Sequence, residues 1–408
     1  MTKKRNGWLI LLLGSLAALG PFSIDMYLPG FGDIAKDLQI DESAVPLSLS
    51  SFFIGISAGQ LLYGPLLDKY GRKKPLYIGL ILYIIAAISC LVVQNLHQLI
   101  IVRFVQAIGC CAASVASIAM VRDLFSVKES PKIFSLIMLV IAASPMFAPT
   151  IGGYIVALLG WKYVFVFLSF VAIVMLLASI FRLPESGKHD PHYSLMPRPI
   201  INGFLSVIKV PQFYTYVSIY AVAFAGLFAY VAASPNTFMK IYHLSKTGYG
   251  WAFAGLSVAF IGSSQVNSWM LKWFHSKQIV VVSLICQAIF TIVFLVFAIN
   301  GWLNLGLFIT FIALFLICLG LINPNAAALT IAPFSKNAGS ASALMGALQM
   351  GLGTVASIVV SLFAEESILP IPLIMACASV ISLACLFIGL RFIKEEVEDS
   401  GEGVFAGH

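Results

Sequence analysis

The sequence predicts an all-α integral membrane protein, and three properties of the chain support this fold class. Of its 408 residues, 60% are hydrophobic and only 10% are charged, whereas an ordinary globular chain is about half apolar and a quarter charged. Apolar stretches of roughly 20 residues, each long enough to cross a bilayer, follow one another along the chain. These stretches are continuous and lack the alternation of lipid-facing strands, so a helical bundle is favoured over a barrel and a water-soluble fold is excluded.

Twelve membrane spans are predicted from these stretches. They cover residues 7–29, 45–67, 76–95, 99–121, 132–158, 163–181, 212–233, 248–271, 278–299, 305–331, 338–364 and 369–390. The basic start and the first apolar run share features with a signal peptide, but removal of this segment would leave eleven spans. We therefore interpret the run as a retained first helix.

The longest polar interruption runs from Arg182 to Lys209, contains four prolines and separates six spans from six. This pattern predicts two halves joined by a linker. The expected parts are a first six-helix half (1–181), a cytoplasmic linker (182–210), a second six-helix half (211–392) and an acidic, disordered tail (393–408).

The basic residues are distributed unevenly between the two sides of the predicted bundle. Of the 24 Lys and Arg residues, 19 lie on the side of the N-terminus, 4 lie on the other side, and Arg103 lies within a span. By the positive-inside rule, both termini are expected to be cytoplasmic. The net charge of +7 is thus explained by topology, and no nucleic-acid partner is expected.

The loop after the second span carries a specific motif, Gly64-Pro65-Leu66-Leu67-Asp68-Lys69-Tyr70-Gly71-Arg72-Lys73-Lys74-Pro75. It resembles the loop signature of the major facilitator superfamily. The resemblance implies a cytoplasmic gate that contains Gly64, Asp68, Gly71, Arg72 and Lys73, in which Arg72 pairs with Asp123 after the fourth span. The alternative is that the basic residues of this loop only set the topology by the positive-inside rule. That rule, however, does not require the glycines and the aspartate of the motif.

Two further segments agree with this family. Arg103-Phe104-Val105-Gln106-Ala107-Ile108-Gly109 in the fourth span is similar to its RxxQGxG element, with Ala107 at the first glycine. Ala148-Pro149-Thr150-Ile151-Gly152-Gly153 in the fifth span resembles the GPxxGG element of antiporters, in which Pro149, Gly152 and Gly153 are the matching residues. Close packing between helices explains such small residues equally well.

The segment Gly20-Pro21-Phe22-Ser23-Ile24-Asp25-Met26-Tyr27-Leu28-Pro29 resembles the bicyclomycin and chloramphenicol resistance subfamily of drug:proton antiporters. Arg122-Asp123-Leu124-Phe125 and the run from Gly339 to Gln349 agree with it. The resemblance implies a major facilitator fold that exports amphipathic, drug-like molecules in exchange for protons. A monomer in the bacterial inner membrane is expected, with the lipid bilayer and a small-molecule substrate as partners and no cofactor other than the proton.

Two charges inside the spans are the candidate coupling residues. Asp25 is the only acidic residue well inside a predicted span, and Arg103 is the only basic one. An ion near the bilayer centre costs about 2.5 to 3.5 kcal/mol on insertion scales. Because burial favours the neutral carboxyl, Asp25 is suited to load and release a proton, with Arg103 stabilising the anion. The alternatives are a carboxylate that reaches the outer interface and an arginine that only anchors helices.

The substrate cavity is expected among polar and aromatic residues at mid-span positions. The candidates are Tyr27, Gln60, Tyr230, Asn236, Trp251, Asn323, Asn325 and Gln349; helix–helix hydrogen bonds or an interfacial aromatic belt are the alternatives. No histidine lies inside a predicted span, and the seven cysteines lack metal-ligand spacing, so neither a histidine relay nor a metal site is expected.

Two other functions remain open from the sequence. The first keeps the fold but imports or exports a specific metabolite or siderophore, and uptake by oriented vesicles would favour it. The second is a membrane-embedded enzyme, which should show a nucleophile with a base or a metal-ligand cluster at membrane depth. No GxxxxGK[ST] loop is present, so ATP is not expected to supply the energy.

Overall fold

The computed structural model describes residues 3–125, 130–186, 197–334, 338–363 and 367–393, and all regular elements within these ranges are helices. Each predicted span is confirmed as a long helix. The first half contains α1 (Lys3–Asp25), α3 (Pro46–Tyr70), α4 (Lys73–Ser89), α5 (Leu96–Leu124), α6 (Ser130–Leu159) and α7 (Lys162–Arg182). The second half contains α9 (Pro211–Pro235), α10 (Lys246–Met270), α11 (Ser276–Ile299), α12 (Leu305–Ile331), α13 (Ala338–Ser361) and α14 (Pro370–Gly389).

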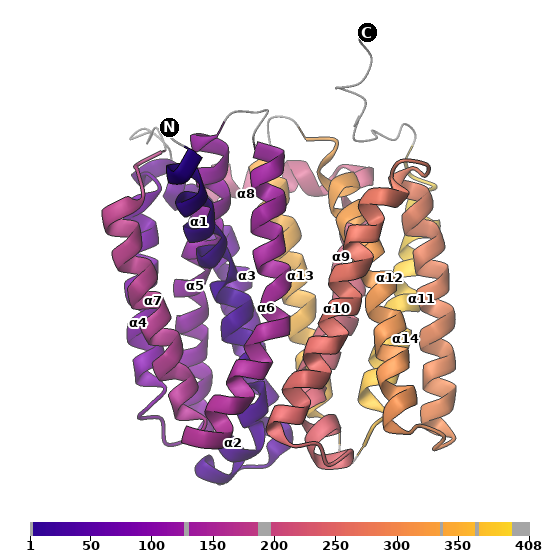
Figure 1. Cartoon of the computed structure of the whole chain (residues 1–408). Coiled ribbons are helices and arrows are strands. Elements are labelled where there is room, and N and C mark those ends of the chain that lie inside the picture. Colours follow the sequence, from indigo (N-terminus) through magenta and orange to yellow (C-terminus); the bar gives the residue numbers. More distant parts are fainter. Residues whose placement is uncertain (1–2, 126–129, 187–196, 335–337, 364–366, 394–408) are drawn as a thin grey trace.

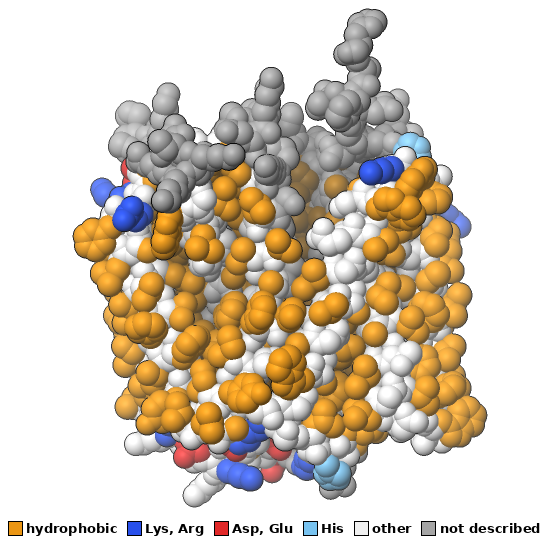
Figure 2. All heavy atoms as spheres, in the orientation of Figure 1, with side chains coloured by type: hydrophobic (Ala, Val, Ile, Leu, Met, Phe, Trp, Pro, Cys, Tyr) orange, Lys and Arg blue, Asp and Glu red, His pale blue; other side chains and the backbone are white. Residues whose placement is uncertain are grey.

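Within the described ranges, ten segments are long and apolar enough to cross a membrane by length and composition alone. The two long helices outside that set are α4, which has 17 residues, and α10. Figure 2 shows hydrophobic side chains over the middle of the bundle and charged side chains at its two ends, as a lipid-embedded surface requires.

The start of α1 and the end of α14 lie at the same end of the bundle in Figure 1, which we call the termini end. The two halves lie side by side, α1 to α7 in one and α9 to α14 in the other. Across the interface, α3 packs on α13 and α6 packs on α10. These four helices therefore carry the contact between the halves.

The structure adds short helices that the spans do not include. The end of the bundle away from the termini, called the opposite end, carries a 3-10 turn (Leu28–Gly30), α2 (Phe31–Leu38) and a second 3-10 turn (Glu42–Ala44). After α9 the backbone continues as a π-helix (Asn236–Ile241). The predicted linker contains α8 (Pro197–Ile208), whose Gly203 and Val207 pack on the start of α13.

Parts of the predicted organisation fall outside the described residues. These are residues 187–196 of the linker and residues 394–408 of the acidic tail. The boundaries of the linker and of the tail therefore remain predictions.

The orientation of the bundle can be tested with single cysteines placed at exposed positions on each end. A membrane-impermeant maleimide applied to intact cells should label Asp41→Cys and should reach Lys209→Cys only after permeabilisation, because the termini end is predicted to be cytoplasmic. The parent protein, whose Cys377 is exposed on a span, is the background control. Labelling of position 209 in intact cells would invert the topology.

Candidate functional site

Asp25 is the last residue of α1 and lies inside the bundle. Its side chain is 4% exposed, and among the described residues it is the only buried acidic side chain, as Arg103 is the only buried basic one. No hydrogen bond or ion pair joins its carboxyl group to another described residue. A buried carboxyl in this position is most stable when it carries its proton.

Arg103 of α5 is fully buried and ties three helices of the first half together. Its guanidinium donates to the carbonyl of Ser23 (2.9 Å) and to Oε1 of Gln106 (2.7 Å). It also lies 4.3 Å from the ring centre of Tyr27 and 4.2 Å from that of Phe52, as cation–π contacts require. In this structure Arg103 makes no ion pair with Asp25, so the geometry favours its interpretation as an anchor for the end of α1.

The turn that follows Asp25 (Leu28–Gly30) packs on α6 of its own half and on α9 and α10 of the second half. Two tyrosines of these second-half helices, Tyr230 of α9 and Tyr249 of α10, lie inside the bundle. Both are buried, and both pack on the ring of Phe253. Tyr230 was among the cavity candidates predicted from the sequence, and Tyr249 was not. The sequence around a tyrosine in an apolar run does not indicate whether its side chain faces the interior of the bundle or the lipid. Asp25 therefore lies at the junction between the halves.

The small residues of α6 allow this junction to close. A Cβ atom added at Gly152 would clash with the carbonyl of Met26, and one added at Gly153 would lie 2.6 Å from the carbonyl oxygen of Lys246. Near these glycines on α6, the hydroxyl group of Thr150 donates a hydrogen bond to the carbonyl of Gly250 on α10 (3.1 Å). A Cβ on Gly250 would lie 2.9 Å from the carbonyl oxygen of Pro149. Adjacent glycines thus let α6 touch the end of α1 on one side and the start of α10 on the other.

An ion pair joins the two halves at the opposite end. Lys246 at the start of α10 bonds to Asp33 of α2 across 213 positions of sequence (2.5 Å). Asp37 of the same short helix pairs with Lys162 (3.0 Å) and accepts from the indole of Trp161 (3.2 Å). Sequence analysis missed these residues, because partners so far apart leave no local pattern.

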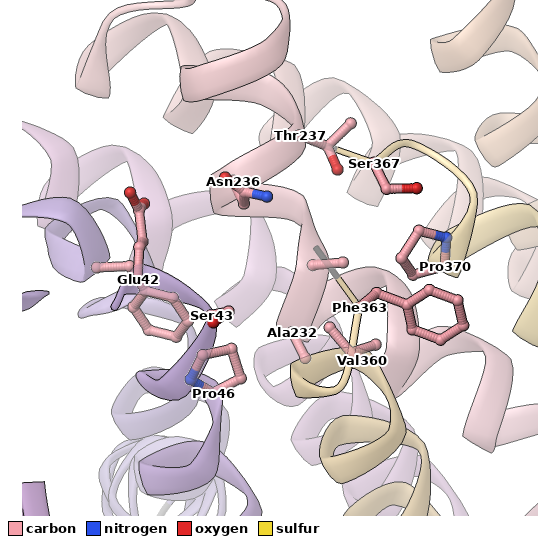
Figure 3. A pocket seen from close by; sticks show the side chains of 12 residues that line it. Glu42, Ser43, Pro46, Ala232, Asn236, Thr237, Val360, Phe363, Ser367 and Pro370 are labelled. Carbon is pink, nitrogen blue, oxygen red and sulfur yellow. The ribbon is translucent and has the colours of Figure 1, made fainter. Parts of the chain in front are cut away.

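The interface contains a small pocket at the opposite end (Figure 3). Phe31, Glu42 and Pro46 line it from the first half, and Asn236 and Val360 are among its residues from the second. Its volume is about 30 Å³, enough for only a few water molecules. Asn236, a candidate cavity residue, therefore lies at a closed part of the interface.

Contacts between α3 and α13 continue the closed interface toward the middle of the bundle. Ser50 donates to Ser357 (2.8 Å), and Ser57 donates to the carbonyl of Ala347 (2.9 Å). The candidate Gln60 packs directly on Gly346. The halves are thus in contact from the opposite end to mid-bundle.

The remaining cavity candidates have separate environments. Gln349 accepts a hydrogen bond from the hydroxyl group of Tyr220 (3.1 Å), and Asn325 donates one to Asn267 (2.6 Å). Both bonds join helices within the second half, which is the structural alternative to a place in the cavity. Oδ1 of Asn323 is buried with no partner among the described residues. Trp251 is 61% exposed on the bundle surface. Its expected place in an interior cavity is therefore wrong, since an aromatic residue does not reveal which face of its helix turns inward.

The predicted gate loop forms a charge cluster at the termini end. Arg72 bonds to Asp68 (2.9 Å) and to Asp123 (2.8 Å), so the pair expected between Arg72 and Asp123 is present. Partial burial acts to lower the pKa of Arg72, but its hydrogen bonds to the two carboxylates outweigh this and raise it. The arginine therefore stays charged over the whole physiological range.

Two linker residues complete this cluster, and sequence analysis did not assign them to it. The backbone N–H of Arg72 donates to Glu185 (2.8 Å), and Ser186 donates to Asp123 (3.3 Å). Gly71 has a φ of 82°, which a residue with a side chain rarely adopts, and the Glu185 carboxylate lies against it. The start of the linker is thus bound to the gate loop.

The other two residues of the motif form no hydrogen bond or ion pair with a described residue of the second half. Lys73 lies over the ring of Tyr77 (5.6 Å). The space around the Cα of Gly64 is open, and the same holds for Gly339 near the start of α13. Among the described residues, nothing thus fills the space beside Gly64 and Gly339 at the termini end.

The two carboxylates of the cluster should differ in their effect on stability. The side chain of Asp123 is 21% exposed and accepts two hydrogen bonds, whereas the side chain of Asp68 is 47% exposed and accepts one. Exposed ion pairs contribute about 0 to 1 kcal/mol, while hydrogen bonds to charged groups contribute about 1.5 to 3 kcal/mol when removed from water. Asp123→Asn should therefore lower the melting temperature of the purified protein more than Asp68→Asn. Equal effects would show that both pairs are solvated.

Comparison with known proteins adds independent support. Residues 13–238 match the family model of the Major Facilitator Superfamily. The chain is 34% identical to an uncharacterized MFS-type transporter of Bacillus subtilis (97% of this chain, 98% of the relative) and 32% identical to a bicyclomycin resistance protein homolog of Haemophilus influenzae (94% and 97%). It is 26% identical to multidrug resistance protein D of Escherichia coli (88% and 90%).

A crystal structure of a D-xylose–proton symporter shares the fold, with a TM-score of 0.74, 14% identity and coverage of 96% of this chain and 97% of the other. At this identity the likeness concerns the fold alone. The family match covers more than half of the chain, and two relatives exceed 30% identity over nearly its whole length. This chain is therefore a multi-pass membrane transporter that belongs to the major facilitator superfamily.

Proposed function

We propose that this transporter is a proton-coupled antiporter that exports small amphipathic compounds across the bacterial inner membrane. Relatives named for bicyclomycin, chloramphenicol and multidrug resistance support the substrate class. The observation that carries the proposal is the position of Asp25, the only buried carboxyl among the described residues, beside the junction of the two halves.

Closure of the opposite end determines which form of Asp25 is stable. With α6 against both the end of α1 and the start of α10, Asp25 is buried next to the contact with the second half. An ionised carboxylate in such a site costs several kcal/mol, and a neutral carboxyl costs far less. The transporter without substrate therefore closes its outer end most readily when Asp25 holds a proton. Its return from the outward-open to the inward-open conformation is thereby linked to proton entry.

The direction of transport follows from the predicted orientation. If the termini end is cytoplasmic, the interface described above is the closed outer gate, and Asp25 loses its proton toward the cytoplasm. Binding of a substrate molecule then favours the conformation that is open to the outside of the membrane. A membrane potential supplies about 2.3 kcal/mol per charge per 100 mV, so exchange of one proton for a neutral molecule can be driven by voltage alone.

In this proposal the cluster around Arg72 is the second gate. Asp68 would meet the start of α13 when the cytoplasmic side closes, because a helix N-terminus carries about half a positive charge and attracts a carboxylate. Asp68 is half-exposed and its neighbour Gly64 lies in open space in the present conformation. Both features leave room for that approach.

Substrate-induced proton release from the purified protein tests the proposal, with chloramphenicol and bicyclomycin as probes across a pH series. The parent should release about one proton per bound molecule, whereas Asp25→Asn should release none, because the amide cannot ionise. Asp41→Asn, at an exposed position on the opposite end, is the matched control and should behave as the parent does. Undiminished release from the Asp25→Asn variant would place the proton carrier elsewhere.

A further inference from the structure

The end of α10 and the turn that follows it expose a group of aromatic side chains. Because α10 begins at the opposite end, this segment, residues 269–274, lies at the termini end; we call it the aromatic turn. Trp269 and Trp273 are 59% and 58% exposed, and their rings form a T-shaped pair with centres 4.2 Å apart. Phe274 beside them is also exposed. Tryptophan is enriched where the hydrocarbon of a bilayer meets the headgroups, so the aromatic turn belongs at the headgroup level.

The aromatic turn also carries positive charge. Lys272 is exposed, and its backbone N–H bonds to the carbonyl of Trp269 (3.2 Å), which holds the lysine next to the tryptophan pair. Lys277 adds a second charge in the first turn of α11. Figure 2 shows basic side chains beside a group of hydrophobic side chains over the termini end of α10 and α11. Charge and exposed aromatic surface therefore occur together here.

The second half supplies no carboxylate at this end to balance the charge. Its only acidic residues are Glu365 and Glu366. In the sequence they stand between Phe363 and Ser367, which line the pocket at the opposite end. The first half differs, because its Arg72 is bound to two carboxylates of the same half. The counter-charge for the aromatic turn must therefore come from outside the second half.

We propose that the aromatic turn binds the headgroup of an anionic phospholipid in the leaflet at the termini end. Lys272 and Lys277 attract the phosphate, while the indoles of Trp269 and Trp273 pack along the glycerol region and the start of the acyl chains. The acidic tail is the other source of negative charge, but it offers few apolar groups to cover the indoles, so the aromatic pair favours a lipid. The inference does not depend on the direction or the coupling of transport.

Native mass spectrometry of the purified full-length protein tests the site, with phosphatidylglycerol and phosphatidylethanolamine of the same acyl chains as probes. The parent should bind phosphatidylglycerol more tightly. Lys272→Gln should lower that affinity about fivefold, the contribution of one basic residue near an anionic surface, and should not change the affinity for phosphatidylethanolamine. Lys272→Arg keeps the charge and should keep the preference. Lys209→Gln, which removes an exposed charge just before α9, is the matched control and should behave as the parent does.

Trp273→Ala examines the aromatic part of the site separately. This variant should weaken binding of both lipids, because the indole packs on the part that they share. Equal affinities of the parent for the two lipids would overturn the proposal, as would unchanged affinities in either the Lys272→Gln or the Trp273→Ala variant. A preference for phosphatidylglycerol that emerges only after removal of residues 395–408 would assign the aromatic turn to the acidic tail and would also overturn it.

Discussion

A charge inside a bilayer must be neutralised, partnered or kept in contact with water. The structure places one carboxyl group, that of Asp25, inside the bundle beside the contact between the two halves. Asp25 ends α1, and the turn that follows it packs on α6, α9 and α10. When the halves close over it, water is excluded and the acid form is favoured. In the proposed mechanism, the protonation of this one side chain is coupled to the relative position of the two halves.

The residues around Asp25 have two different structural roles, which the sequence alone does not distinguish. Arg103 is enclosed by Tyr27, Phe52 and a carbonyl of α1, and desolvated cation–π contacts of about 2 kcal/mol each offset part of the cost of its burial. It holds the first half together. Gly152 and Gly153 instead let the second half approach. One set of contacts keeps α1 in position, and the other brings the two halves together beside it.

The sequence predicts the twelve long helices because a lipid environment demands about 20 apolar residues for each. It predicts Asp25 and Arg103 because ions inside such runs are rare. It does not predict α2 and α8, which are too short to span, nor the pair of Asp33 with Lys246, which depends on tertiary contact alone. Trp251 is a second example of what the sequence does not predict. Its aromatic side chain is compatible with a substrate cavity, but it lies on an exposed face of its helix.

The central claim is that protonation of Asp25 controls closure of the opposite end. Electron–electron distances between spin labels at Lys36→Cys on α2 and Trp302→Cys on the second half, in a background without the native cysteines, measure that closure directly. The account predicts a short distance at acidic pH, a growing population of longer distances as the pH rises, and a short distance at every pH when Asp25 is replaced by Asn. A distance distribution that ignores pH in the parent, or one that still follows pH in the Asp25→Asn variant, would contradict it.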